Sequence, residues 1–173
     1  KALTTWVDSV SALTQPDSVI WCDGTQREQD ELTREMTDSG DLLPLNRETH
    51  PNCFLHRSNP NDVARVEQLT FVCTPNQVDA GPNNNWMAPE KGHETMDRLF
   101  AGCMKGRKLY VVPYLMGPEG SPYSQVGVEI TDSPYVVVNM AIMARIGRPA
   151  MDRLANNNSF VKGIHSIGEL DPE

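Results

Sequence analysis

The chain has 173 residues, with 15 lysine and arginine residues against 23 aspartate and glutamate residues, and a formal net charge of −8. This acidic surplus argues against a general nucleic-acid surface or an anionic-membrane surface, because both need clustered positive charge. The longest apolar stretch, around residues 134–146, is too short and too interrupted to cross a bilayer.

The first 46 residues predict a helix and two strands around a longer helix. Apolar residues on one face predict a helix over Thr5–Thr14, and the run Val19–Cys22 predicts a buried strand. A short strand is expected over Leu42–Asn46. The strand–helix–strand order indicates a layered α/β domain.

The longer helix carries its own start and stop signals. Thr25 and Glu28 form a capping box, in which the threonine hydroxyl accepts from the Glu28 amide and the glutamate reaches back. The helix is expected to run to about Ser39 and to end at Gly40, since glycine tolerates the left-handed conformation of a helix end.

The middle of the chain is more polar. Leu69–Cys73 predicts a strand, Pro75–Trp86 a long polar loop, and Glu94–Phe100 a helix with Met96, Leu99 and Phe100 on its apolar face.

The second half predicts three strands. Leu109–Met116 is the strongest, and Pro113 inside it suggests an edge strand or a bulge, because proline cannot donate to the ladder. Val126–Ile130 is the next strand, and Phe160–Ile167 the last.

Between those strands a helix is expected to begin at Ser133 as N-cap with Pro134 at the first helical position, and to run to Gly147. Its β-branched run Val136–Val138 is poor for a helix, so burial must stabilise it.

The cysteines and histidines suggest no metal centre. Cys22, Cys53, Cys73 and Cys103 lack CxxC spacing, and buried free thiols are the simplest interpretation. No two histidines have ligand spacing, so surface or core roles are favoured for all four.

Arg65 is the best chemical candidate. It lies in the run Asp62–Glu67, after a turn sequence and before an apolar strand, where a guanidinium could bind a carboxylate or phosphate through two hydrogen bonds. The residues alone favour the simpler alternative, an ordinary surface ion pair.

Five blocks together resemble the GTP-dependent phosphoenolpyruvate carboxykinases, in order and over nearly the whole chain. They are His56–Glu67 with the strand after it, Asp79–Met87, Gly102–Arg107 running into Tyr110–Pro113 and Met116–Pro118, Gly127–Val137, and Phe160–Lys162 with His165–Gly168.

The resemblance implies an α/β (mixed α+β) fold, a mixed sheet flanked by helices. Residues 1–173 would be the N-terminal domain that binds oxaloacetate or phosphoenolpyruvate, incomplete at its C-terminal end. The family converts oxaloacetate and GTP to phosphoenolpyruvate, GDP and carbon dioxide. It uses Mn²⁺ with a second ion, commonly Mg²⁺. The parent protein is expected to be a cytoplasmic, monomeric enzyme that binds neither nucleic acid nor membrane.

By the same resemblance, Arg65 would bind the substrate carboxylate and Glu67 would contact a mobile lid, whereas Arg57 is not the substrate arginine. No other catalytic residue is expected here, and no metal or nucleotide ligand, because the family's metal ligands, phosphate loop and lid do not occur in the sequence. The 173 residues alone are therefore expected to be inactive. The alternatives are a non-catalytic module that binds dicarboxylates and an interaction domain.

Overall fold

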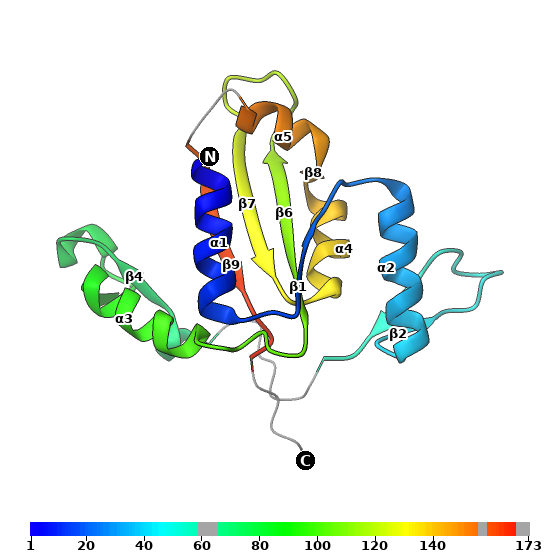
Figure 1. Ribbon diagram of the computed structural model, residues 1–173, viewed down its shortest axis with the longest axis horizontal. Helices are drawn as coiled ribbons and strands as arrows, with labels where there is room; N and C mark the ends of the chain where they lie inside the picture. The colour runs from blue at the N-terminus through cyan, green and yellow to red at the C-terminus, as the bar shows by residue number, and fades with distance from the viewer. Residues whose placement is uncertain (59–65, 156–158, 169–173) are drawn as a thin grey trace, which may run out of the picture. The chain divides into compact units, whose positions relative to one another are not determined.

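The computed structural model describes residues 1–58, 66–155 and 159–168 (Figure 1). The chain divides into two compact units, and each is described by itself. Unit 1 consists of Lys1–His56 and Gly102–Glu173, and unit 2 of Arg57–Ala101. Unit 2 is therefore an insertion in the sequence of unit 1.

A five-stranded mixed sheet is the centre of unit 1. Its main path runs in the order β1 (Ser18–Trp21), β6 (Lys108–Met116), β7 (Gln125–Thr131), β9 (Val161–His165), and β8 (Arg145–Ile146) also pairs with β6. The pairs β1–β6 and β7–β9 are parallel, whereas β6 is antiparallel to β7 and β8. The mixed sheet and the predicted strands β6, β7 and β9 are confirmed.

Pro113 lies in the middle of β6, which is a central strand, so the prediction of an edge strand was wrong. On one side Pro113 pairs with Val128, and on the other its carbonyl accepts from the amide of Gly147 (2.9 Å). The N–H and C=O of one strand residue point the same way, so the missing donor faces the junction where β1 ends and β8 begins. The parallel pairing of β1 with β6 ends before it, at Trp21 and Val111.

Helices cover both faces of the sheet. On one face lie α1 (Ala2–Thr14) and α5 (Arg148–Ala155), where Trp6 lies 5.6 Å from Phe160 between ring centroids and Ala150 packs with Leu115 and Val126 (Figure 1). The other face carries α2 (Gln26–Ser39) and α4 (Pro134–Met143). Their buried cluster with the sheet is Cys22, Leu32, Tyr110, Val112, Val137 and Ile146.

The predicted ends of α2 are confirmed. The Thr25 hydroxyl accepts from the Glu28 amide (3.3 Å), and the Glu28 carboxylate accepts from the amides of Asp23 (3.1 Å) and Gly24 (2.9 Å). Gly40 ends the helix with φ 87°. Local chemistry thus determines this element.

The predicted start of α4 is confirmed as well, since the Ser133 hydroxyl accepts from the Val136 amide (3.4 Å). Val137 is 0% exposed, as the β-branched run required. The helix ends at Met143 and not at Gly147, because the chain leaves it to form β8. Helix α5 and strand β3 (Phe54–His56), which pairs with β2 (Leu42–Pro44), were not predicted.

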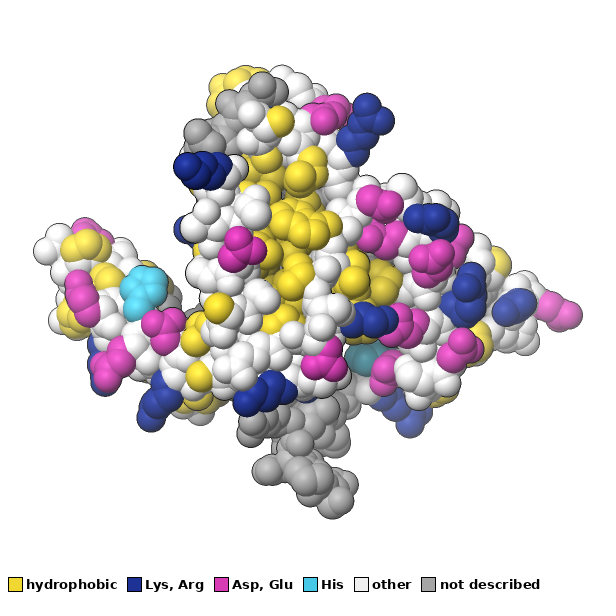
Figure 2. Space-filling model, viewed as in Figure 1, with side chains coloured by type: hydrophobic (Ala, Val, Ile, Leu, Met, Phe, Trp, Pro, Cys, Tyr) yellow, Lys and Arg dark blue, Asp and Glu magenta, His cyan; other side chains and the backbone are white. Residues whose placement is uncertain are grey.

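Strand β1 is exposed, although a buried strand was predicted. Val19, Ile20 and Trp21 are 36%, 38% and 42% exposed, because β1 forms an edge of the sheet. Figure 2 shows apolar side chains gathered over the sheet between α1 and α2. A pocket of about 210 Å³ lies there, lined by Trp21, Leu3, Met151, Leu154 and Phe160 among others.

Unit 2 has little core of its own. It contains η1 (Glu67–Leu69), β4 (Phe71–Cys73), η2 (Gln77–Ala80), β5 (Asn85–Met87) and α3 (Pro89–Phe100), with β4 and β5 parallel. The first residue of the predicted 69–73 strand therefore belongs to the helix η1. The predicted 75–86 loop contains the helix η2 and the first two residues of β5. Helix α3 starts at residue 89, earlier than the predicted residue 94. Among the described residues of this unit, Ala80 is the one buried apolar residue.

The four cysteines are free, as predicted. Cys22 and Cys103 are buried, but Cys53 and Cys73 are exposed, so burial was wrong for the second pair. Cys53 lines a second pocket of about 390 Å³ at the β2–β3 connection, together with Pro44 and Arg47. In the described part of the chain, no helix is both long and apolar enough to span a membrane.

Candidate functional site

The loop predicted to bind substrate lies in unit 2. Arg65 itself lies outside the described residues, whose next stretch begins at Val66. Glu67 opens the short helix η1 and its side chain is exposed. The structure therefore shows the scaffold that follows Arg65 and places Glu67 two residues along it.

Asn85 on β5 fixes the backbone of this scaffold. Its side-chain amide donates to the carbonyls of Glu67 (2.6 Å) and Thr70 (3.1 Å). The Thr70 hydroxyl in turn donates to the carbonyl of Val66 (2.7 Å). The Glu67 carbonyl also accepts from the Thr70 amide (3.2 Å) and the Val66 carbonyl from the Leu69 amide (3.1 Å), so the chain from Val66 to Thr70 has a defined path.

Asn85 is held by its own neighbours. The Trp86 indole donates to the Thr74 carbonyl (2.8 Å), and the Asn84 amide donates to the Ala80 carbonyl (2.7 Å). Two blocks that the sequence analysis treated separately, His56–Glu67 and Asp79–Met87, are thus joined by hydrogen bonds. Sequence reasoning assigned no role to Asn85, because an asparagine in a run of three gives no sign of its partner.

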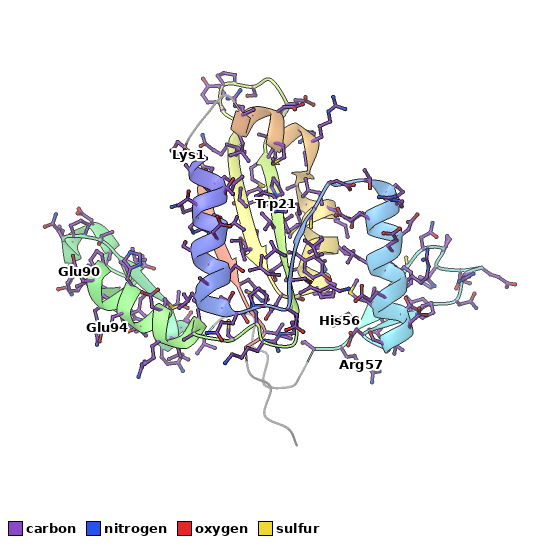
Figure 3. The ribbon with its side chains drawn as sticks, viewed as in Figure 1. Lys1, Trp21, His56, Arg57, Glu90 and Glu94 are labelled. Atoms are coloured by element: carbon purple, nitrogen blue, oxygen red, sulfur yellow. The ribbon has the colours of Figure 1, made fainter. Side chains whose placement is uncertain are left out.

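The residue before the loop is fixed within unit 1. His56 ends β3, and its ring stacks on Tyr135 of α4 with 3.9 Å between centroids and 23° between planes. Its Nδ1 lies 2.8 Å from the carbonyl oxygen of Asp41, and since a carbonyl only accepts, Nδ1 carries the proton. Arg57 follows with an exposed side chain (Figure 3).

A buried ion pair lies elsewhere in unit 1. Both Nε and a terminal nitrogen of Arg107 are 3.0 Å from one carboxylate oxygen of Asp132, whose side chain is 0% exposed. The guanidinium also donates to the carbonyls of Cys103 and Gly168. A buried charge is tolerated when it is paired and hydrogen-bonded in this way.

The same carboxylate fixes the segment after β9. Asp132 accepts from the Ser166 hydroxyl (2.7 Å) and the Ile167 amide (3.0 Å). Beside it, Nδ1 of His165 lies 2.9 Å from the Thr131 hydroxyl. Arg107 and Asp132 lie in separate blocks that carry the resemblance, and no contact between them was predicted, because 25 residues separate them in the chain.

The described residues do not supply a metal site. Within residues 1–58, 66–155 and 159–168, no three histidine, cysteine, aspartate or glutamate side chains are grouped so that they could hold an ion.

These features define a mixed α/β protein, in which an inserted unit holds the backbone that follows Arg65. The family model described as "Phosphoenolpyruvate carboxykinase N-terminal domain" matches residues 5–173, and the chain belongs to this family.

The names of curated relatives agree with this family assignment. The chain is 51% identical to the phosphoenolpyruvate carboxykinase (GTP) of Anaeromyxobacter dehalogenans (strain 2CP-C) over 97% of its own length. It is 52% identical to the protein of the same name from Chlamydia trachomatis over 96%, and 50% identical to that from Corynebacterium jeikeium over 96%. In each case the chain spans 28% of the relative's length.

Proposed function

We propose that this chain is the organic-acid-binding part of a GTP-dependent phosphoenolpyruvate carboxykinase. The observation that carries the proposal is about 50% identity over nearly the whole chain to relatives of that name. In this reaction oxaloacetate loses carbon dioxide, and the resulting enolate oxygen takes the γ-phosphoryl group of GTP to give phosphoenolpyruvate and GDP.

Arg65 is proposed to bind the substrate carboxylate and then the phosphoryl oxygens as they form. A planar guanidinium presents parallel donors to a carboxylate, and its fixed charge offsets negative charge that develops in the transition state. Such positioning needs a supported backbone, and the Asn85 bonds to Glu67 and Thr70 supply that support two and five residues beyond Arg65.

Glu67 is proposed to contact the lid that closes over the site. Its carboxylate is exposed and its backbone is held by Asn85, so the side chain is free to meet another segment while its position is fixed. Mn²⁺, Mg²⁺ and GTP would be held by residues outside this chain. From the family we also propose a cytoplasmic, monomeric parent enzyme.

The test is Arg65→Ala in the full-length enzyme. We expect kcat/KM for oxaloacetate to fall by at least about 100-fold, since a charge-assisted bidentate contact and its transition-state contribution are lost together. Circular dichroism and the thermal midpoint should stay close to those of the parent.

Arg57→Ala is the matched control, because it removes a neighbouring exposed arginine and should change kcat/KM only slightly. Unchanged kinetics in Arg65→Ala, or an equal loss in both variants, would contradict the assignment of Arg65.

A further inference from the structure

Two polar side chains lie flat on neighbouring strands of the unit 1 sheet. Tyr114 on β6 pairs with Gly127 on β7, and Glu129 on β7 pairs with Gly163 on β9. A Cβ at Gly127 would clash with the tyrosine ring, and one at Gly163 would clash with the glutamate carboxylate. The glycines therefore leave the space that these two side chains occupy, here named the Glu129 patch.

The Glu129 patch has no donor of its own. Among the described residues, no hydrogen bond or ion pair reaches the Glu129 carboxylate or the Tyr114 hydroxyl. His165, on the same face of β9 as Gly163, is bonded to Thr131 instead. The patch thus combines a half-buried negative charge with an aromatic ring.

Burial changes the pKa of both groups in the same direction. Burial raises the pKa of the Glu129 carboxyl above its ordinary value. Burial, followed by the nearby charge of Glu129, raises the pKa of Tyr114. A raised carboxyl pKa marks a charge that has lost water without gaining a cation, and a nearby positive charge would reverse the effect.

The Glu129 patch lies beside an exposed part of the sheet face. Helix α4 lies on this face beside β6 and β8, whereas β9 is at the opposite edge of the sheet (Figure 1). Val161, on the same face as Gly163, is 53% exposed. Neither of the two pockets described above is lined by Glu129 or Tyr114. An open face of this kind fits a polypeptide better than an enclosed small ligand.

We propose that Glu129 and Tyr114 receive a lysine or arginine side chain from a segment of the longer family protein that lies outside residues 1–173. Charge complementarity favours a cation, and the tyrosine ring beside the carboxylate adds a cation–π contact. The occupant would come from the part of the longer protein that these 173 residues do not cover, since the chain spans 28% of the length of a relative. The proposal concerns an interaction surface, so it stands or falls independently of the reaction and of Arg65.

The first test measures thermal unfolding of the full-length protein. Glu129→Gln should lower the midpoint by several degrees, and Glu129→Lys should lower it further because it sets like charges together. Glu119→Lys makes the same charge change on an exposed loop residue and should leave the midpoint nearly unchanged. A midpoint unaffected by Glu129→Lys, or lowered equally by Glu119→Lys, would overturn the proposal.

The second test identifies the occupant. Val161 is replaced by the photoreactive residue p-benzoylphenylalanine in the full-length protein, which is irradiated and digested for mass spectrometry. A cross-link within one chain to a peptide outside residues 1–173 is expected. Cross-links only to a second copy, only to residues 57–101, or to nothing would overturn the proposal.

Discussion

Among the described residues, Asp132 is the one charged residue that is buried, and its carboxylate accepts several hydrogen bonds. Its carboxylate accepts from the Arg107 guanidinium, the Ser166 hydroxyl and the Ile167 amide, which belong to two separate stretches of chain. The side chain of Arg107 is 26% exposed and that of Asp132 is 0% exposed, so the two partners are not equivalent. Loss of the arginine would leave the carboxylate without its cation in a dry environment.

Arg107→Met should therefore lower the free energy of unfolding by about 3–5 kcal/mol, the usual cost of an uncompensated buried charge. Urea unfolding at pH 7 measures the change. Arg27→Met is the control, since Arg27 pairs with Glu31 on the surface at 3.9 Å, and such exposed pairs contribute about 0–1 kcal/mol. Equal effects of the two substitutions would contradict this account of Asp132.

Tyr110 makes the free energy of unfolding depend on pH in the alkaline range. Burial, with the negative charge of Glu35 as the next cause, raises the pKa of Tyr110 from an ordinary value of 10.0 to about 12. A raised folded-state pKa contributes stability that is complete below pH 10 and is lost as the pH rises through 12.

The free energy of unfolding should thus fall more steeply with pH between about 10 and 12 in the parent than in Tyr110→Phe, which has no phenol to ionise. Urea unfolding at several pH values measures both slopes. Identical slopes would show that the folded state does not raise the pKa of the Tyr110 phenol.

At the scale of single residues, sequence reasoning succeeded where the chemistry was local. Thr25, Glu28 and Ser133 accept from amides within five residues, and each was predicted to cap its helix. It missed Asn85 and the Arg107–Asp132 pair, because a long-range partner leaves no mark in the nearby sequence. The role of Arg65 came from the family resemblance and remains a prediction.

Among the elements, two turns of unit 1 meet backbone to backbone. A Cβ at Gly147, between β8 and α5, would clash with the carbonyl of Asp23, and a Cβ at Gly24 would clash with the carbonyl of Ile146. Gly147 also has φ +77°, a conformation that only glycine adopts freely. The turn after β1 and the turn after β8 therefore depend on each other for space.

Gly147→Ala should destabilise unit 1 by well over the cost of backbone strain alone, which is about 1–2 kcal/mol for a left-handed residue with a side chain. Gly106→Ala isolates that strain, since Gly106 has φ +76° and open space around its Cα. Urea unfolding of both variants gives the difference, and similar losses in the two would refute the close approach.

The elements also show why pattern reasoning fails in places. The apolar run of β1 looked buried, but burial depends on position in the sheet, and β1 became an edge. Helix α5 starts at Arg148-Pro149 and has eight residues, too few for a clear apolar period. Strand order and close turns come from contacts between distant segments, which hydrophobic periodicity does not encode.

For the molecule as a whole, the contrast in core size between the two units predicts a difference in local stability. Unit 1 contains the buried strands β6 and β7, in which Leu109, Val111, Val128 and Ile130 are 0% exposed. The described residues of unit 2 include one buried apolar side chain, Ala80. Regions with few buried contacts open at lower free energy than the core.

Hydrogen exchange measured by mass spectrometry on the full-length protein should show amides of β4, β5 and η2 exchanging well before those of β6 and β7. Peptides from the surface helix α2 provide an internal reference within unit 1. Protection of β4 and β5 equal to that of β6 would contradict a weakly stabilised insertion.

The pairing of β1 with β6 also sets an order of events during protein synthesis. Ser18 pairs with Lys108, so 90 further residues must be made after Ser18 (108 minus 18) before β6, the neighbour of β1 among the described strands, begins to appear. At about 5–20 residues per second, translation takes about 5–18 s to supply that partner. Throughout this interval Val19, Ile20 and Trp21 lack that partner strand on the nascent chain, and we expect chaperones that bind exposed apolar segments to bind there.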